Sequence, residues 1–238
     1  MHDPVALAPQ PIGAPVAPHA ADRPQRVTMT GRWVTLVPLD AERHSEVLFA
    51  ASNGGDKDRL WTYLFDGPYA DLAIFKAAMV EREKSLDPLF FAVIDNASGQ
   101  PVGIQSFLRI EPAHRVIEVG SLLYTSAMQR TIGATEAQYL FAVYIFDTLG
   151  YRRYEWKCNA LNAPSRRAAL RLGFAFEGVF RQHMIIKGRN RDTAWYSMLD
   201  SEWPRRRAAF ERWLSPENFD AAGRQRVSLA SLNGAPAD

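Results

Sequence analysis

Residues 118–149 constrain the fold more than any other stretch, because an apolar strand runs there through a turn of small and polar residues into an amphipathic helix. The expected strand ends at Tyr124, the turn contains Gln129, and the helix begins near Gly133 and stops at Gly150. Backbone amides in the first turn of a helix have no partner inside the helix, and the helix dipole adds positive potential there. The layout therefore predicts a site for a phosphate-bearing ligand at the start of this helix.

Composition favours one well-buried α/β domain. The 238 residues are 47% hydrophobic, which is enough for one such domain with tails, or for two small domains at most. The single cysteine, Cys158, excludes an internal disulfide, and no apolar run is long enough to span a membrane. We therefore expect a cytoplasmic protein with no membrane partner. The net charge of only +2 argues against wrapping of nucleic acid, so no nucleic-acid partner is expected.

Both ends of the chain differ in composition from the middle. Residues 1–27 are rich in Ala and Pro and lack the features of a secretory signal, so we expect a flexible tail. Residues 216–238 are polar and contain Gly, Ala and Ser, and we expect a polar C-terminal tail. The folded domain should cover residues 28–215. The basic run at residues 205–207 is expected to solvate a last helix rather than to bind nucleic acid.

Within the domain, hydrophobic periodicity and turn residues predict a mixed α/β (α+β) fold. Expected strands cover residues 32–37, 89–94, 101–110, 115–124, 153–158, 175–186 and 193–199. Expected helices follow Asp40, cover residues 71–84 and 133–149, and run from Pro164 to Gly173, and residues 61–69 form an aromatic loop. A helix connects the strand that ends at Tyr124 to the strand at 153–158, so these two should pair in parallel.

A second block of residues sharpens the interpretation. It begins at Asn162 and continues through Gly173 and Phe174, Glu177 and Gly178, and the run at residues 187–192. Together with the strand, turn and helix it resembles the GNAT N-acetyltransferase superfamily, in its RimJ/RimL-like branch. The resemblance covers essentially the whole expected domain. It implies the GNAT fold, with a mixed, mostly antiparallel central sheet that is splayed at the cofactor site and flanked by helices. It also implies acetyl-CoA, or another acyl-CoA, as cosubstrate, and no metal.

The turn after Tyr124 fits the GNAT cofactor frame, Gln/Arg-x-x-Gly-x-Gly/Ala, with one departure. Ile132 stands where the first glycine belongs, while Thr135 and its two neighbours match a run common in this branch. The cofactor residues that the resemblance implies are Leu122, Leu123, Tyr124, Gln129, Arg130, Thr131, Ile132, Gly133, Ala134, Thr135, Asn162 and Ser165. The residues alone also allow ordinary helix capping by Thr131, Thr135 or Asn162. Apolar side chains at residues 122–124 would suit any buried strand.

Two residues are candidates for the chemistry. Amide formation needs a neutral amine, and Glu118 is the candidate base because it is a carboxylate in an apolar strand, where burial would raise its pKa. The alternative is a partly exposed glutamate paired with Arg115 or Arg153. Many GNAT enzymes have a tyrosine acid where this chain has Ala169, and resemblance to the RimJ/RimL-like branch gives Ser165 a part in protonating the leaving thiolate. A thiolate can also leave unassisted.

The acceptor side is less clearly marked. Trp61, Tyr63 and Tyr69 resemble the aromatic loop that walls the acceptor groove in this branch, and they could equally form a satellite core cluster. His183, on a late strand, is a candidate contact for the acceptor or a surface residue. Close relatives that modify ribosomal proteins carry a glutamate where this chain has Met184, which argues against a ribosomal substrate.

Three functions follow from these residues. The first is an acetyl-CoA-dependent N-acetyltransferase whose partner is an amine-bearing peptide N-terminus or a small-molecule amine. The second uses succinyl-CoA or a similar donor, whose carboxylate nearby arginines would neutralise. The third is a catalytically silent acyl-CoA-binding sensor, which Ile132 and Ala169 allow. A homodimer is compatible with all three.

Overall fold

The structure is a computed structural model that describes residues 10–234. Its strands are β1 (Met29–Thr30), β2 (Val34–Pro38), β3 (Leu89–Asp95), β4 (Pro101–Glu111), β5 (Val116–Tyr124), β6 (Arg153–Asn159), β7 (Ala175–Ile186) and β8 (Arg189–Leu199). Its helices are α1 (Ala41–Ser52), α2 (Lys57–Trp61), α3 (Leu72–Lys84), α4 (Ile132–Val143), α5 (Ala163–Arg171), α6 (Trp203–Leu214) and α7 (Leu229–Leu232). A π-helical turn, η1 (Tyr144–Thr148), extends α4, and a 3₁₀ turn, η2 (Pro216–Asn218), follows α6.

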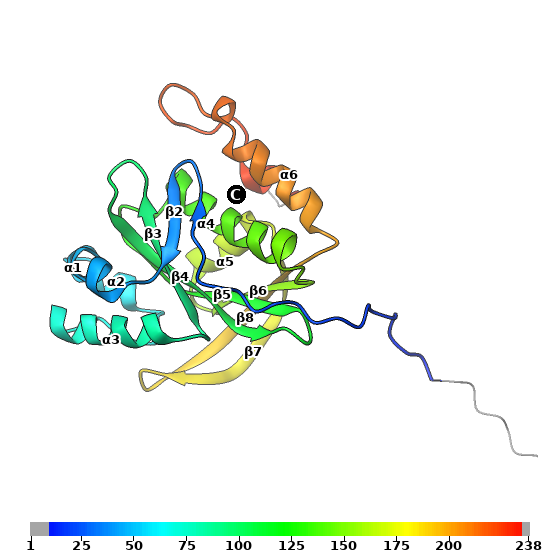
Figure 1. The fold of residues 1–238 in the computed structure, drawn as a ribbon, viewed down its shortest axis with the longest axis horizontal. Coiled ribbons are helices and arrows are strands. Elements are labelled where there is room, and N and C mark those ends of the chain that lie inside the picture. Colours follow the sequence, from blue (N-terminus) through cyan, green and yellow to red (C-terminus); the bar gives the residue numbers. More distant parts are fainter. Residues whose placement is uncertain (1–9, 235–238) are drawn as a thin grey trace, which may run out of the picture.

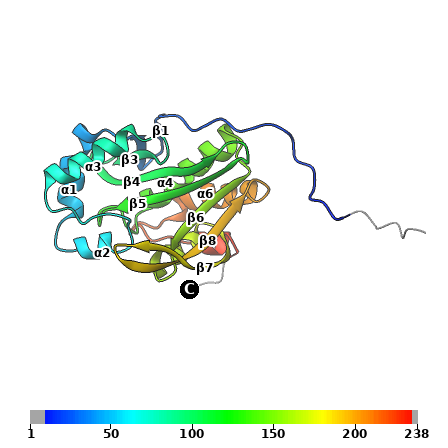
Figure 2. The same ribbon diagram turned by 90° about the horizontal axis from the view of Figure 1, so that it is seen from below.

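The strands form one open sheet in the order β1-β2-β3-β4-β5-β6-β8-β7. Every neighbouring pair is antiparallel except β5 and β6, which pair in parallel as expected from the helix that joins them. Figures 1 and 2 show the sheet with α4 and α6 on one side and α1 to α3 grouped near its first half. The predicted mixed, mostly antiparallel sheet with flanking helices is confirmed.

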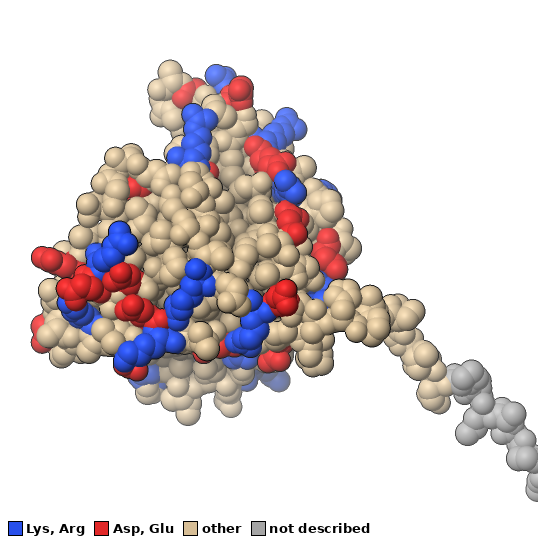
Figure 3. All heavy atoms as spheres, in the orientation of Figure 1, with Lys and Arg blue, Asp and Glu red and all other residues tan. Residues whose placement is uncertain are grey.

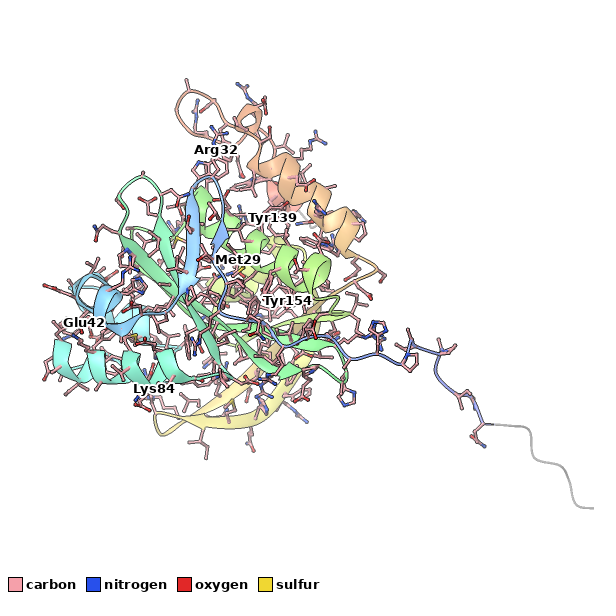
Figure 4. All side chains as sticks on the ribbon, in the orientation of Figure 1. Met29, Arg32, Glu42, Lys84, Tyr139 and Tyr154 are labelled. Atoms are coloured by element: carbon pink, nitrogen blue, oxygen red, sulfur yellow. The ribbon has the colours of Figure 1, made fainter. Side chains whose placement is uncertain are left out.

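Helices on the two faces of the sheet enclose separate cores. In the first core, under α4, α5 and α6, Phe107 stacks on Phe141 with ring centroids 3.8 Å apart, and Phe91 meets both rings edge-on. In Figure 4, Tyr154 of β6 lies among these elements and Tyr139 lies between α4 and α6. The second core, under α1 to α3, covers β3 and β4. Helices α1 to α3 thus cover the second face over the first half of the sheet.

Local sequence explains where the helices begin. Asp40 caps α1 by accepting a hydrogen bond from the amide of Arg43 at 3.0 Å, and Asp71 caps α3 in the same way. Pro164 occupies the first turn of α5, where its missing N–H costs nothing. The predicted starts after Asp40 and at Asp71 are therefore confirmed to within one residue.

The structure adds β1, η2 and α7 to the expected elements, and three expected elements have other bounds or neighbours. Helix α4 does not continue regularly to Leu149 but ends in η1, where the amide of Leu149 bonds to the carbonyl of Tyr144 five residues earlier. The short helix α2 (Lys57–Trp61), which is not among the expected elements, precedes the aromatic loop and includes its first residue. Strand β8 begins at Arg189 instead of Thr193, because Lys187 and Gly188 both have positive φ and make a tight hairpin turn.

The end segments make contacts with the domain. Residues 10–20 are exposed and leave the domain as an extended segment (Figure 1), but Ala21 is buried and its amide donates to the carbonyl of Pro112 at 3.1 Å. Near the other end, Leu229 of α7 is fully buried. The flexible and polar tails at 1–27 and 216–238 stay predictions. No helix within residues 10–234 is long and apolar enough to cross a membrane.

Candidate active site

Strands β5 and β6 part in the middle of the sheet. Their parallel pairing runs from Val116, opposite Arg153, to Val119, opposite Trp156. Beyond that point β5 continues against β4 to Tyr124, and β6 continues against β8 to Asn159. The two strands therefore diverge toward their carboxyl ends and leave backbone groups that face the gap without a strand partner in the described chain.

The predicted pantetheine residues lie on the free part of β5. Leu122 and Tyr124 pack against the first core, and Leu123 is buried in the second core. Because these side chains pack into the two cores above and below the sheet, it is the backbone of residues 122–124 that faces the gap. Ser121 has φ 52°, and the β4–β5 register shifts there, so a β-bulge marks the point where β5 leaves β6.

The turn between β5 and α4 is held by its own residues. The amides of Met128 and Gln129 both donate to the carbonyl of Thr125, and the Gln129 side chain donates to the carbonyl of Tyr124 at 2.8 Å. Thr131 caps α4 by accepting from the amide of Ala134 at 3.1 Å. The cap serves one of the amides of the first turn, so the remaining ones can still meet an anion.

Backbone angles explain why Ile132 can replace the glycine of the family frame. Arg130, with φ 62°, takes the left-handed position in this turn, and Ile132 has no positive φ. Gly133 serves a different purpose, because a Cβ there would lie 2.7 Å from Cγ1 of Val34. That glycine allows α4 to approach β2 closely, so a side chain at position 133 would disturb packing as well as any ligand.

The two residues after Ala134 hold other parts of the chain. Thr135 is buried and accepts a hydrogen bond from the guanidinium of Arg171 on α5 at 3.0 Å. Glu136 accepts from three successive backbone amides, Arg32, Trp33 and Val34, at 2.7, 2.7 and 2.9 Å. Figure 4 places Arg32 at the turn before β2. The sequence run around Thr135 thus joins α4 to β2 and to α5.

Asn162 and Ser165 lie at the start of α5, across the gap. The side chain of Asn162 caps the helix by accepting from the amide of Ser165 at 3.2 Å, as the capping alternative expects. Ser165 is half-buried, and its Oγ accepts from Nε1 of Trp156 at 3.1 Å. Cys158 is buried in the first core, where burial raises the pKa of its thiol. Ser165 therefore lies beside β6 near the end where the gap opens.

Glu118 belongs to a buried cluster of charges on the face opposite α4. Its carboxylate is 2.9 Å from Nζ of Lys157 and 3.3 Å from Nε of Arg109. Burial raises the pKa of Glu118 above its ordinary value, while Lys157 and Arg109 act in the opposite direction. The alternative of a partly exposed glutamate paired with Arg115 or Arg153 is not seen in the described residues. Glu118 is buried and pairs with Lys157 and Arg109, while Arg153 pairs with Glu155.

Lys157 organises this cluster. Its Nζ also lies 2.6 Å from the carboxylate of Glu155 and 3.8 Å from the ring centroid of Trp195. The ammonium group thus joins two carboxylates and an aromatic face while its side chain is buried. Sequence reasoning missed Lys157 and Arg109. The charged residues at alternate positions 155 and 157, in a strand whose other face is apolar, were the available signal.

His183 lies near the same cluster. Its Nδ1 is 2.9 Å from Oγ1 of Thr193, and its ring lies edge-on to Phe180. Partial burial, together with the positive charges of Arg109, Arg191 and Lys157, lowers the pKa of His183. The imidazole is therefore mostly neutral at pH 7.

The aromatic loop comes close to the β7–β8 hairpin. Nζ of Lys187 at the hairpin turn donates to the carbonyl of Trp61 at 2.8 Å, and the hydroxyl of Tyr63 donates to the carbonyl of Leu161 at 3.2 Å. Trp61 itself is fully buried and its ring meets that of Tyr69 edge-on. A completely buried ring offers no surface to an acceptor, so Trp61 fits the core alternative, while half-buried Tyr63 lies between the loop and the gap.

The site thus combines three features: a splayed parallel strand pair, a capped helix start at its open end, and a buried carboxylate beside the gap. The GNAT acetyltransferase domain matches residues 34–175, more than half of the chain, and the protein belongs to the GNAT acetyltransferase family.

Individual relatives agree with this assignment. The ribosomal-protein-serine acetyltransferase of Escherichia coli K12 is 32% identical over 102 residues, which cover 42% of this chain and 56% of that protein. The chain thus spans about half the length of this curated relative. A GCN5-related N-acetyltransferase from Brucella melitensis is 53% identical, with a TM-score of 0.89 over 91% of this chain and 98% of that one. A probable GNAT-family acetyltransferase from Chromobacterium violaceum is 38% identical, with a TM-score of 0.74 over 82% and 100%.

Proposed function

We propose that the protein transfers the acetyl group of acetyl-CoA to a primary amine, either a protein N-terminus or a small molecule. The observation that carries the proposal is the gap between β5 and β6, which leads directly to the capped start of α4. A long, thin ligand with a phosphate-rich end fits such a path. Its acyl end would reach the buried carboxylate of Glu118.

The proposed cofactor contacts follow the path of the gap. The pyrophosphate would lie at the turn and first amides of α4, residues 129–135, with the guanidinium of Arg130 close by. The pantetheine arm would run along the backbone of residues 122–124, facing Asn162 across the gap. The residues fit this placement. Within residues 10–234, β5 has no strand partner on its gap side beyond Val119, and the cap of Thr131 takes only the amide of Ala134 in the first turn of α4.

The proposed reaction is a direct transfer. The amine nitrogen attacks the thioester carbonyl, the N–C bond forms, the C–S bond breaks, and the proton of the amine passes to Glu118, directly or through a water. A backbone amide near Leu122 or Leu123 would stabilise the oxyanion, because it is fixed before the reaction. The departing thiolate would take its proton from Ser165 or from solvent.

The partners of Glu118 bear on its role as a base. Lys157 favours the ionised form that can accept a proton, and burial keeps the pKa above that of a free carboxylate. A carboxylate with a raised pKa takes a proton from the acceptor amine more readily than an exposed one, and only the neutral amine can attack the thioester. The cluster therefore suits a base that works at neutral pH.

Fewer observations bear on the identity of the amine acceptor. The matched curated relative acts on a ribosomal protein by name, yet this chain carries Met184 at the position of the glutamate expected in such enzymes. We propose that the acceptor is a peptide or a small amine. We also propose that the enzyme is cytoplasmic and forms a homodimer. Figure 3 shows both signs of charge intermixed on the visible face, without one continuous basic surface.

Thiol release tests the proposal. Purified protein would be mixed with acetyl-CoA or succinyl-CoA and a panel of peptides and amines, and free thiol would be followed together with acylated product. Amine-dependent release from acetyl-CoA is the expected result, and faster release from succinyl-CoA would replace the proposed donor. Binding of CoA without release for any amine would identify a sensor and contradict the proposal.

A further inference from the structure

Arg191, near the start of β8, is buried, and residues 10–234 offer it no acidic partner. The residue is 8% exposed, and its guanidinium carbon lies 5.0 Å from the ring centroid of Phe65 in the aromatic loop. One terminal nitrogen donates to the sulfur of Met184 at 3.0 Å. Its Nε is buried and has no hydrogen-bond partner within residues 10–234. Among these described residues, no carboxylate lies within salt-bridge distance of the Arg191 guanidinium.

A guanidinium buried in this way lacks the counter-charge and hydrogen bonds that normally compensate its burial. Burying a charged group costs free energy unless an opposite charge or several hydrogen bonds compensate, and a thioether sulfur is only a weak acceptor. Arginine presents a planar set of donors that matches a carboxylate, so a bound carboxylate would supply what the site lacks.

The position of Arg191 connects it to the proposed active site. The next residue, Asp192, accepts a hydrogen bond through its carbonyl from the amide of Ala160, just beyond the end of β6 where the gap opens. The charges of Glu118 and Arg109 act on Arg191. Alternate residues of a strand lie on one face, and Trp195, four residues after Arg191 on β8, contacts the ammonium of Lys157. Arg191 therefore lies on the same face of the sheet as the candidate base.

The charges around this space do not balance. The cluster and its directly paired residues contain four cations, Arg109, Arg153, Lys157 and Arg191. They contain three carboxylates, Glu118, Glu155 and Glu177. Burial lowers the pKa of His183, and the positive charges of Arg109, Arg191 and Lys157 add to this effect. The cluster thus has room for one more negative charge.

We propose that Arg191 binds a carboxylate of the acceptor, so that the acceptor is a primary amine that also carries a carboxylate. This inference rests on the proposed function and narrows its substrate class. Glu118 attracts the amine and Arg191 attracts the carboxylate, which gives the space two charges of opposite sign to orient an α-amino acid or an acidic peptide start. A carboxylate on the acyl donor could also bind Arg191, but it would not explain why a group that attracts the amine and a group that attracts a carboxylate lie on the same face of the sheet.

The test compares acceptors that differ only in one carboxylate. Amino acids would be paired with their amides, and peptides with Glu near the N-terminus with the corresponding Gln peptides, in the thiol-release assay with acetyl-CoA. The wild-type protein should prefer the carboxylate member of each pair. In Arg191→Met the KM for these acceptors should rise about 10- to 100-fold, with the amides and CoA affinity little changed. Arg191→Lys should keep part of the preference.

Arg189→Gln is the matched control, because Arg189 is exposed on the same hairpin and its loss changes the net charge equally. This variant should behave as wild type. The inference is overturned if wild-type protein shows no carboxylate preference, if Arg191→Met shifts KM equally for both members of a pair, or if its effect is confined to succinyl-CoA as donor. If no amine is acylated, the proposed function fails instead. Calorimetry of carboxylate and amide amines with CoA-saturated protein then decides whether Arg191 selects a carboxylate.

Discussion

The two faces of the sheet at the parting of β5 and β6 have opposite chemistry, although alternate residues of the same strands form them. On the α4 face, Ile117, Tyr154 and Trp156 join an aromatic core. On the other face, Glu118 and Lys157 form a buried charged cluster. Burying paired charges rarely stabilises a fold more than apolar residues of similar size would, so packing does not explain the second face. The contrast shows that alternate residues of one strand can serve different purposes: those on one face stabilise the fold, and those on the other are available for chemistry.

The largest effect should come from the charged face. Glu118→Gln removes the proposed base while keeping its shape, so turnover should fall by a factor on the order of 10² to 10⁴ with CoA affinity nearly unchanged. Glu155→Gln is the control, because Glu155 is the other carboxylate on Lys157. Steady-state kinetics and calorimetry measure the two quantities. Wild-type turnover of Glu118→Gln across the full pH range would exclude the role.

Lys157→Met should affect both stability and pH dependence. Loss of the cation leaves Glu118 and Glu155 buried without their shared partner, which should lower the free energy of unfolding by about 3–5 kcal/mol at pH 7. A base works only above its pKa, and Lys157 lowers the pKa of Glu118. The acid limb of the pH–rate profile should therefore move to higher pH in the variant. An unmoved limb in folded protein would show that Glu118 does not control it.

Phe141→Ala tests the apolar face. Phe141 is fully buried and stacks on Phe107, so truncation should cost about 3–5 kcal/mol of unfolding free energy. Because no titrating group is touched, the pH–rate profile of the folded protein should keep its shape. Denaturant unfolding and kinetics at permissive temperature check this. A displaced acid limb would mean that the two faces are coupled more strongly than the contrast suggests.

The smallest effect should appear in the phosphate turn. Arg130→Ala and Arg130→Gly both remove the guanidinium, so CoA affinity should fall by the same modest factor in both. Glycine relieves the left-handed backbone at φ 62°, so the Gly variant should be more stable than the Ala variant by about 1 kcal/mol. Thermal melts and CoA titrations of the pair separate the two effects. Equal stability would indicate that the turn has a different backbone when free of ligand.

Sequence patterns predicted the local elements and the parallel pairing, because caps, periodicity and a helical crossover are written in neighbouring residues. They could not predict which charges meet. Lys157 reaches Glu118 only through the register of β5 against β6, and Arg191 enters the same space only because β8 pairs on the other side of β6. Burial of Trp61 likewise depends on how the flanking helices α1 and α3 pack against β3 and β4. Contacts set by strand register are invisible to composition and spacing.

The hold of Glu136 on the amides of residues 32–34 also orders the assembly of the chain during synthesis. These amides leave the ribosome well before Glu136, which lies about a hundred residues later in the chain. Closing so long a loop costs entropy that other contacts must offset. Strand β2 can pair with β3 earlier, but the turn between β1 and β2 gains its acceptor only after α4 has emerged. In a growing chain, this early turn is therefore secured late.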